Sequence, residues 1–478
     1  MNSDYPLVKA SGILGHQLHD LNPAQMLEFG VLATGASVAH DSRKVIRQPH
    51  QLASKLLRVV GLVLIAATAA TGYATDGYFS DGYGVKSQGR AGVALTETDD
   101  AFGGANNPAT TVWAADRLDT GISYFRPIRS ADRTGATGPA AALNGRVTSI
   151  HDDFFVPEFG FKHALSLDVA VGVTVYGNGG MDTYYNPGQL NLGPGHSGLN
   201  LLAGPGALGV DLQQMLVAPT VAWKITPNQS VGLSPIIGYQ RFKAYGISAF
   251  AGLSQDPTAL TDRGYDQAFG GGVRLGYFWN ITPVVAVGTA YSSPVFFQTF
   301  DKYRGLFAGN GSFDIPQNVG AGVGWQALPS LRLSVDYKWI DYADIAPVGN
   351  SSSNPGQLGQ SGGPGFGWRS ISVIKFGTDW NVTDHWTLRA GYSYNENPVP
   401  SQSVTFNILA PAVTQQHLTV GSTFEFGRQE VSVSYVHAFR NSVTGASQFV
   451  ALGQAPAGTS ETIAMYQDVV GVQYSYKF

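Results

Sequence analysis

The side chains best suited to acid–base or metal chemistry lie in two short groups. His151-Asp152-Asp153 has the residue types of a metal site, and Asp99-Asp100 those of an acid–base pair. The first group lies in a long polar stretch, so we interpret it as charge exposed to solvent. The second lies among Gly and Ala, and we interpret it as a source of local hydrogen bonds. No His-Glu-x-x-His or phosphate-loop motif occurs. We therefore expect no metal, no cofactor and no enzyme activity; a barrel with an esterase or protease site is the less favoured alternative.

A second set of candidate functional residues is apolar and lies in long segments between the expected strands. Its members are Tyr184, Tyr185, Leu201, Leu202, Phe296, Phe297 and Phe307. The loops of water-filled pores usually carry charged side chains. Apolar loops instead indicate a protein that captures a hydrophobic small molecule. An aromatic girdle at the membrane interface is the alternative for any one of these residues.

The composition is typical of a β-rich membrane protein. The 478 residues include 29 Lys and Arg against 33 Asp and Glu, a net charge of −4, which gives no basic footprint for nucleic acid. Only 13% of residues are charged, whereas soluble domains carry about 25%. The 60 glycines and 12% aromatics suit turns, bulges and aromatic girdles. The chain has no cysteine, which excludes disulfides and thiolate metal sites.

The N-terminal region carries a targeting pattern. The apolar stretch 59–70 follows Lys55 and Arg58 and is too short to span a bilayer as a helix. Small residues follow it, so residues 51–74 are predicted to be a signal peptide cleaved after Ala74. Residues 1–50 are a leader of doubtful origin that we expect to be disordered.

The rest of the chain alternates apolar and polar side chains with the period of a β-strand. In the last ten residues, Val470, Val472, Tyr474, Tyr476 and Phe478 share one face. Fourteen such segments occur, at about 119–126, 154–162, 167–176, 213–224, 230–242, 268–279, 284–292, 317–325, 331–339, 371–381, 386–395, 416–426, 430–440 and 468–478. The even number, the short turns and the long loops predict a 14-stranded antiparallel transmembrane β-barrel over 118–478. A soluble barrel is the alternative, but it would pack an apolar interior.

Residues 75–117 precede the first strand and show no alternation. They are rich in Gly and Ala, and they cannot pass through lipid, where unpaired backbone groups are costly. We expect this segment to be a hatch that plugs the lumen; a position in the periplasm is the alternative.

From about Thr75 to Phe478 the chain resembles the FadL family, outer-membrane transporters of long-chain fatty acids and other hydrophobic compounds. The most specific matching pieces are Asn107-Pro108-Ala109 and the stretch 388–400, which contains Leu-Arg-Ala-Gly-Tyr-Ser-Tyr and Pro-Val-Pro. Gly89-Arg90-Ala91 and the terminal Phe478 support them.

The resemblance implies a route for the ligand. In the family, ligand is captured at an outer groove, moves to an inner pocket and leaves sideways through a kink in the third strand. Here the third strand runs into Gly177-Asn178-Gly179-Gly180, where a strand can bulge without side-chain penalty. An ordinary glycine turn is the alternative.

The resemblance also implies basic groups that hold a fatty acid carboxylate inside the barrel, and it places Arg241 at one of them. Alternation disagrees, because Arg241 shares a face with Val231 and Leu233 and would point outward from an unbroken strand. The second position has no lysine here. We expect Arg369 to substitute for it, or the ligand to lack a carboxylate.

Taken with the resemblance, the pattern predicts a monomeric transporter in the bacterial outer membrane, surrounded by its lipid and without a nucleic-acid partner. Its expected ligand is a long-chain fatty acid. Uptake of aromatic or aliphatic hydrocarbons on the same fold is the first alternative, and a diffusion porin for polar solutes is the second. A structural or adhesin barrel without transport is the third.

Overall fold

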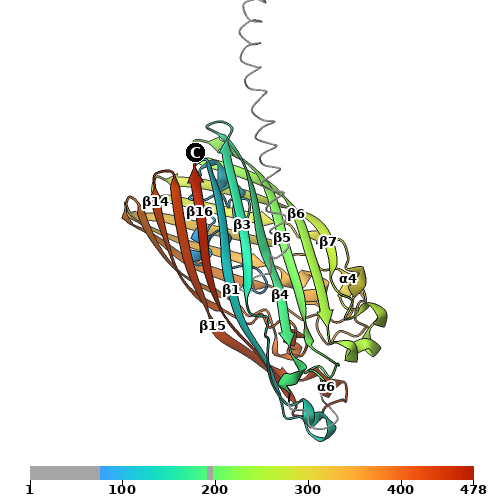
Figure 1. Ribbon diagram of the computed structural model, residues 1–478. Coiled ribbons are helices and arrows are strands. Elements are labelled where there is room, and N and C mark those ends of the chain that lie inside the picture. The colour runs from blue at the N-terminus through green and yellow to red at the C-terminus, as the bar shows by residue number, and fades with distance from the viewer. Residues whose placement is uncertain (1–75, 191–197) are drawn as a thin grey trace, which may run out of the picture. The chain divides into compact units, whose positions relative to one another are not determined.

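The computed structural model describes residues 76–190 and 198–478, and its main feature is a closed antiparallel barrel (Figure 1). The strands of the ring are β1 (Arg117–Thr134), β3 (Phe154–Ala164), β4 (Val169–Tyr185), β5 (Leu208–Thr226), β6 (Gln229–Tyr245), β7 (Asp266–Thr282), β8 (Val285–Ser292), β10 (Asn318–Leu328), β11 (Leu331–Ile340), β12 (Ile371–Thr383), β13 (Trp386–Asn395), β14 (Gln416–Phe426), β15 (Gln429–Ala446) and β16 (Ser460–Lys477). Pairing of β16 with β1 closes the ring. The predicted 14-stranded antiparallel barrel is confirmed.

Two short strands lie outside the ring. β2 (Gly145–Thr148) pairs with β1, and β9 (Phe296–Phe297) pairs with β7. Both belong to the long connections at one end of the barrel. Because bacterial barrels have short periplasmic turns and long extracellular loops, this end is the extracellular one.

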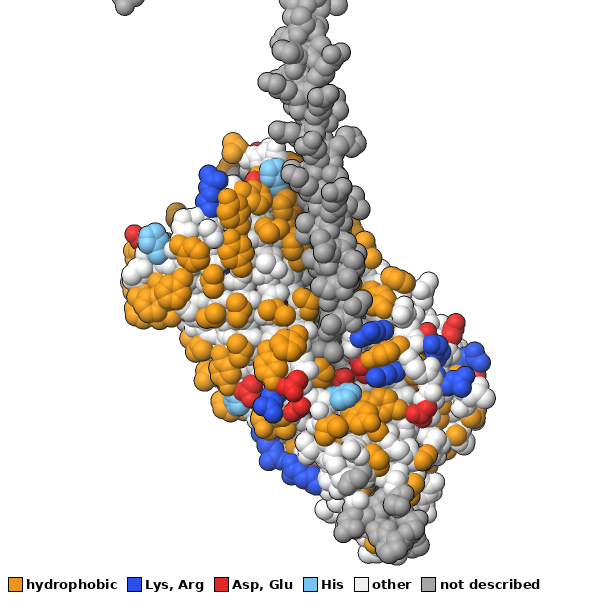
Figure 2. Space-filling model, viewed as in Figure 1, with side chains coloured by type: hydrophobic (Ala, Val, Ile, Leu, Met, Phe, Trp, Pro, Cys, Tyr) orange, Lys and Arg blue, Asp and Glu red, His pale blue; other side chains and the backbone are white. Residues whose placement is uncertain are grey.

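The two faces of the wall differ in the way that alternation predicted. In β16, Val470, Val472 and Tyr474 are exposed, whereas Gln473 and Ser475 are fully buried. Figure 2 shows hydrophobic side chains spread over the outer wall. The outer face is therefore apolar and the inner face polar, as a barrel in lipid requires.

Six strands run further toward the extracellular end than the sequence indicated. β1 reaches Thr134 instead of residue 126, and β4 reaches Tyr185 instead of residue 176. β5, β6, β15 and β16 are extended at the same end. Beyond the lipid, the outer face no longer has to be apolar, so alternation fades although the strand continues.

Short helices occupy the extracellular connections. They are η3 (Gly138–Leu143), η4 (Pro187–Gln189), η5 (Ser248–Leu253), η6 (Pro257–Ala259), η7 (Asp301–Tyr303), α4 (Ala308–Gly311), η8 (Tyr342–Asp344), α5 (Ala346–Gly349), η9 (Ser401–Ser403), η10 (Phe406–Ile408) and α6 (Gln448–Ala451). Among the residues that the structure describes, none of the helices has the length and apolarity needed to cross a membrane.

The N-terminal segment, residues 76–116, includes α3 (Val85–Gly89) and η2 (Pro108–Val112). Its contacts reach inward-facing groups on strands far apart around the ring. Lys86 pairs with Glu430 on β15, and the backbone amide of Ala94 donates to Asp336 on β11. The predicted leader (1–50) and signal peptide (51–74) lie outside the described residues.

Candidate functional site

An apolar pocket, hereafter the loop pocket, lies among the extracellular connections; about 470 Å3 of space in and around it is free of protein atoms, part of it open to solvent. Its lining residues are Leu202, Ile247, Phe250, Leu306, Phe307, Ala308, Pro347, Leu358, Pro364, Gly365, Phe366, Phe406 and Leu409. They come from five different connections. None of the thirteen has a charged or hydrogen-bonding side chain, so the pocket can offer only apolar contact.

The predicted capture residues divide into three groups. Leu202 and Phe307 line the loop pocket. Tyr185, Leu201 and Phe297 belong to, or pack against, the hydrophobic core around it.

The remaining two point elsewhere. Phe296 is exposed, and Tyr184 stacks on His151 at a ring distance of 4.7 Å on the outer face. The sequence argument missed Ile247, Phe250, Phe406 and Leu409, because residues 246–265 and 396–415 were not recognised as long loops. Phe406, Ile408 and Leu409, three large apolar residues close together outside any strand, were the available signal.

The wall of the barrel has a gap between β3 and β4. The two strands pair only from Ala164–Ala170 to Phe159–Val175. Beyond that point, residues 154–158 of β3 pair with β1 alone, and β4 continues to Tyr185 paired with β5 alone. The pairing of β4 with β5 shifts register between Gly177 and Gly179, which is a bulge. The predicted Gly177-Asn178-Gly179-Gly180 site therefore coincides with an irregularity in the third ring strand.

The free edge of β4 at this gap is paired by the N-terminal segment. The amide of Ser80 donates to the carbonyl of Asn178 at 3.1 Å, and the amide of Gly180 donates to the carbonyl of Tyr78 at 3.2 Å. A Cβ at Gly179 would overlap the Tyr78 carbonyl, so only glycine permits this approach. Backbone groups that lipid could not satisfy are thus satisfied from inside the barrel.

A smaller cavity of about 340 Å3 lies next to the gap. Its lining includes Tyr78, Phe125, Gly180, Met181 and Met465. Arg129 on β1 also lines this cavity. Its guanidinium donates to the carbonyls of His151 and of Asp182 on β4, and these hydrogen bonds link β1 to β4 on the extracellular side of the gap.

The Asn107-Pro108-Ala109 motif is held against β5, β6 and β7 of the wall. The Asn107 side chain caps η2 by accepting from the Ala109 amide at 3.1 Å, and its Nδ2 donates to the carbonyls of Leu95 and Tyr277 at 2.8 and 3.1 Å. A Cβ at Gly232 or Gly276 would overlap this motif. The wall therefore carries glycines where the motif touches it.

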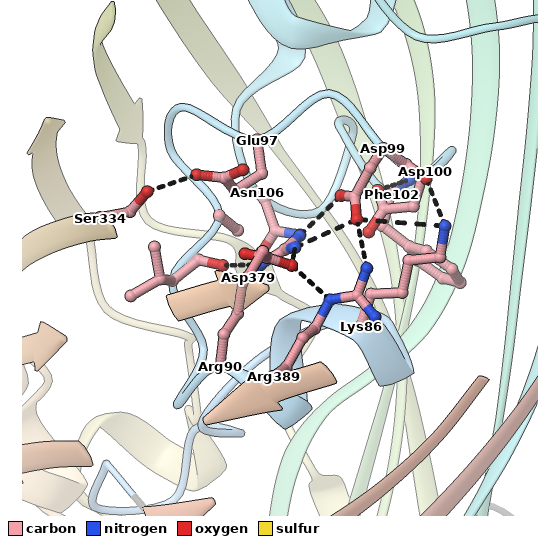
Figure 3. A network of polar contacts seen from close by, with 12 residues as sticks. Lys86, Arg90, Glu97, Asp99, Asp100, Phe102, Asn106, Ser334, Asp379 and Arg389 are labelled. Atoms are coloured by element: carbon pink, nitrogen blue, oxygen red, sulfur yellow. Dashed lines mark hydrogen bonds and ion pairs between the residues drawn. The ribbon is translucent and has the colours of Figure 1, made fainter. Parts of the chain in front are cut away.

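The periplasmic end holds a polar vestibule of about 1390 Å3. Figure 3 shows four of its charged residues together, with Asp99 and Asp379 between Arg90 and Arg389. Arg90 pairs with Asp99 at 2.7 Å and with Asp379 at 2.9 Å, and Arg389 pairs with the same two carboxylates at 3.1 and 2.5 Å. Asp99 is thus part of an ion-pair network that joins the N-terminal segment to the wall.

Asp100 has a different role from its neighbour. Its Oδ1 accepts from the amide of Phe102 at 2.8 Å. Burial, helped by the nearby Asp99 and Asp119 carboxylates, raises the pKa of Asp100 to about 6.

Arg241 and Arg369, the predicted carboxylate partners, do not reach the loop pocket. Gln240 and Phe242 face the interior, so Arg241 between them faces outward, where its Nε donates to Gln213 at 2.9 Å. This outward direction is the one that alternation indicates. Arg369 is exposed in the connection before β12.

The His151-Asp152-Asp153 group is dispersed rather than convergent. His151 Nδ1 lies 3.1 Å from Asp182 Oδ1, while Asp152 lies 3.6 Å from Arg126. Across residues 76–190 and 198–478, no three His, Asp or Glu side chains are placed to hold a metal ion.

Comparison with known proteins agrees with this geometry. The family model described as "Outer membrane protein transport protein (OMPP1/FadL/TodX)" matches residues 62–478. No curated protein sequence matches the chain.

Many solved structures match the chain, and three examples show the similarity in fold. A Pseudomonas aeruginosa FadL homologue has a TM-score of 0.63 at 15% identity, covering 84% of this chain and 99% of that one. The Pseudomonas putida toluene transporter TodX has a TM-score of 0.59 at 15% identity, with coverage of 83% and 99%. The Ralstonia pickettii toluene transporter TbuX has a TM-score of 0.56 at 18% identity, with coverage of 83% and 99%. The chain therefore belongs to the OMPP1/FadL/TodX family, and it is an outer-membrane β-barrel transporter of hydrophobic compounds.

Proposed function

We propose that this protein takes up neutral hydrophobic compounds, aromatic or aliphatic hydrocarbons, from the cell exterior. In this proposal the loop pocket captures the compound, the cavity next to the wall gap receives it, and the gap releases it sideways into the membrane. The observation that carries the proposal is the gap between β3 and β4, which has a cavity beside it and whose β4 edge is paired at Asn178 and Gly180 by the N-terminal segment.

The preference for neutral cargo rests on the lining of the loop pocket. An ionised carboxylate buried without a partner is costly, and no cation lines this pocket. The relatives TodX and TbuX are described as toluene transporters. Long-chain fatty acids, the ligand expected from the sequence, become the second candidate, because neither Arg241 nor Arg369 is placed to hold a carboxylate there.

The sideways route follows from the energetics of apolar surface. A hydrocarbon gains about 25 cal/mol for each Å2 moved from water into lipid, so release into the aqueous periplasm is unfavourable. The polar vestibule, with its ion pairs, would also have to be crossed on a straight route. In this proposal the N-terminal segment acts as a hatch that blocks the straight route and covers the lateral one.

The route can be tested by filling the gap. A Cβ at Gly177 would lie 3.0 Å from Val156 Cγ1 on β3, so a long side chain there would occupy the space between the strands. We expect Gly177→Arg with Gly180→Val to lower uptake of labelled toluene at least tenfold, while heat-modifiable folding and toluene binding persist. The matched control is Gly252→Arg with Gly362→Val, where an added Cβ meets open space.

Each outcome bears on a separate part of the proposal. Wild-type uptake in the gap variant would show that the exit lies elsewhere. Cargo class is tested independently, by comparing uptake of labelled toluene with that of labelled oleate in cells with and without the protein. Protein-dependent uptake of oleate alone would reject neutral cargo.

A further inference from the structure

The outer face of β6 changes character along its length. Its outward side chains are apolar from Val231 through Leu233 and Ile237, and then become cationic at Arg241 and Lys243. The end with the tight turn is periplasmic and the end with the long loop is extracellular. The change from apolar to cationic therefore occurs toward the cell exterior, and Figure 2 shows charged side chains gathered beyond the apolar part of the wall.

The position of the change matches the edge of the hydrocarbon. From Val231 to Arg241 there are ten residue steps. At about 3.4 Å per residue and a strand tilt of about 40°, they rise by about 26 Å. The apolar band of such barrels is about 25 Å tall. Arg241 and Lys243 thus lie at the level of the lipid headgroups of the outer leaflet.

Both cations are held in place by one aromatic ring. Arg241 Cζ and Lys243 Nζ each lie 4.6 Å from the centroid of Tyr265. The Tyr265 hydroxyl donates to Asp211, a buried carboxylate that also lies 3.8 Å from Lys243 Nζ. Ordered cations at a lipid boundary can recognise a headgroup, whereas flexible ones only attract it.

Arg241 and Lys243 both keep hydrogen-bond donors that are free to contact a ligand. Within the described part of the chain, Arg241 donates through Nε to Gln213, and neither of its terminal nitrogens donates to a protein group. The Lys243 ammonium likewise donates no hydrogen bond there, since Asp211 is beyond hydrogen-bonding distance. Asp211 is the carboxylate nearest to Lys243, and the terminal nitrogens of Arg241 and the Lys243 ammonium keep several free donors. A phosphate group matches that arrangement, because Arg and Lys both bind phosphate oxygens.

Aromatic rings continue from the cations along the same level of the wall. Lys243 Nζ lies 5.6 Å from the ring of Tyr245, which packs against Tyr184 at 5.3 Å. Tyr184 in turn stacks on His151. A tyrosine side chain combines an apolar ring with a polar hydroxyl, so it suits the membrane interface, and the face of its ring can lie against a sugar ring.

We propose that this surface binds a phosphorylated glycolipid of the outer leaflet. Acyl chains lie on the apolar face of β6 and β7, a phosphate contacts Arg241 and Lys243, and the sugar lies toward Tyr245 and Tyr184. The proposal gives Arg241, which faces away from the lumen, a function outside it, and it does not depend on the identity of the transported compound.

The test compares lipid retention by the folded full-length protein. We expect native mass spectrometry in detergent to show bound bis-phosphorylated hexa-acyl lipid A for the wild type. Retention should fall at least tenfold in Arg241→Ala with Lys243→Ala. The matched control is Arg146→Ala with Arg304→Ala, which removes two exposed cations, each 53% exposed, from the extracellular connections and should retain lipid A.

Any one of the following outcomes would overturn the proposal. The first is equal retention of lipid A by the double variant and the wild type. The second is equal binding of enzymatically dephosphorylated lipid A, which would leave the phosphate without a role. The third is complete displacement of lipid A by millimolar inorganic phosphate, or equal binding of phosphatidylglycerol, because the site would then recognise a free anion or any acidic lipid.

Discussion

The loop pocket and the polar vestibule lie in the same barrel but have lining residues of opposite polarity. The loop pocket has no charged side chain in its lining, whereas the vestibule is lined by Arg90, Arg389, Asp99 and Asp379 among many other ionisable groups. The loop pocket offers apolar contact to a guest, and the vestibule satisfies its charges with one another. In the proposed function, a hydrophobic compound is stabilised in the loop pocket and opposed by the vestibule, which favours the proposed release between them.

The N-terminal segment separates these two regions and is attached differently to each. Toward the gap it is held by backbone hydrogen bonds to β4 at Asn178 and Gly180. Toward the vestibule it is held by ion pairs of Lys86 and Arg90. Two backbone bonds are worth about 1 kcal/mol each, whereas loss of one partner in a buried ion pair costs about 3–5 kcal/mol. Each of these ion pairs is thus a stronger link than either backbone bond.

The largest expected effect comes from breaking that attachment. Asp379→Ala removes a carboxylate that pairs with both Arg90 and Arg389 and leaves two guanidinium groups facing one remaining partner. We expect a cost of about 3 kcal/mol, or more than a hundredfold in the equilibrium between the seated and loosened segment. Planar-bilayer recordings should show a higher ion conductance for the variant than for the wild type.

The control for that variant is another vestibule carboxylate with a weaker pair. Glu425 pairs with Lys477 at 2.7 Å, but both side chains are partly exposed, so Glu425→Ala should change stability by less than about 1 kcal/mol and keep the conductance of the wild type. An Asp379→Ala barrel that folds and conducts no more than the wild type would mean that the ion pairs do not secure the segment.

The sequence predicted the wall far better than it predicted the pocket. Each lipid-facing strand carries its own pattern, so fourteen strands and the outward direction of Arg241 followed from residues such as Val231 and Leu233. The loop pocket has no local pattern, because residues as distant as Leu202 and Leu409 meet only in the folded chain. The vestibule network was missed for the same reason: Arg90 and Asp379 are 289 positions apart.

The apolar side of the comparison can be tested by adding charge. Leu358 lines the loop pocket, while Leu253, whose carbonyl accepts from the Leu358 amide, is exposed. Leu358→Arg replaces apolar contact worth about 1.5–3 kcal/mol with a charge, so toluene uptake at limiting concentration should fall about tenfold or more. Leu253→Arg adds the same charge next to it and should leave uptake unchanged. Equal uptake by both variants would argue that the loop pocket is not the capture site.

The smallest expected effect concerns pH and the N-terminal segment. The raised pKa of Asp100, about 6, means that the folded protein holds this proton more tightly than the unfolded chain, where Asp titrates near 4. The resulting stabilisation is complete below pH 4 and is lost as pH rises through 6. Hydrogen exchange in residues 98–106, corrected for intrinsic rates, should therefore be a few-fold slower at pH 5 than at pH 7.5. Asp100→Asn keeps an acceptor for the Phe102 amide but cannot titrate, so it should lose this difference. The same pH dependence in both proteins would assign the effect to other groups, because only titration of Asp100 distinguishes them.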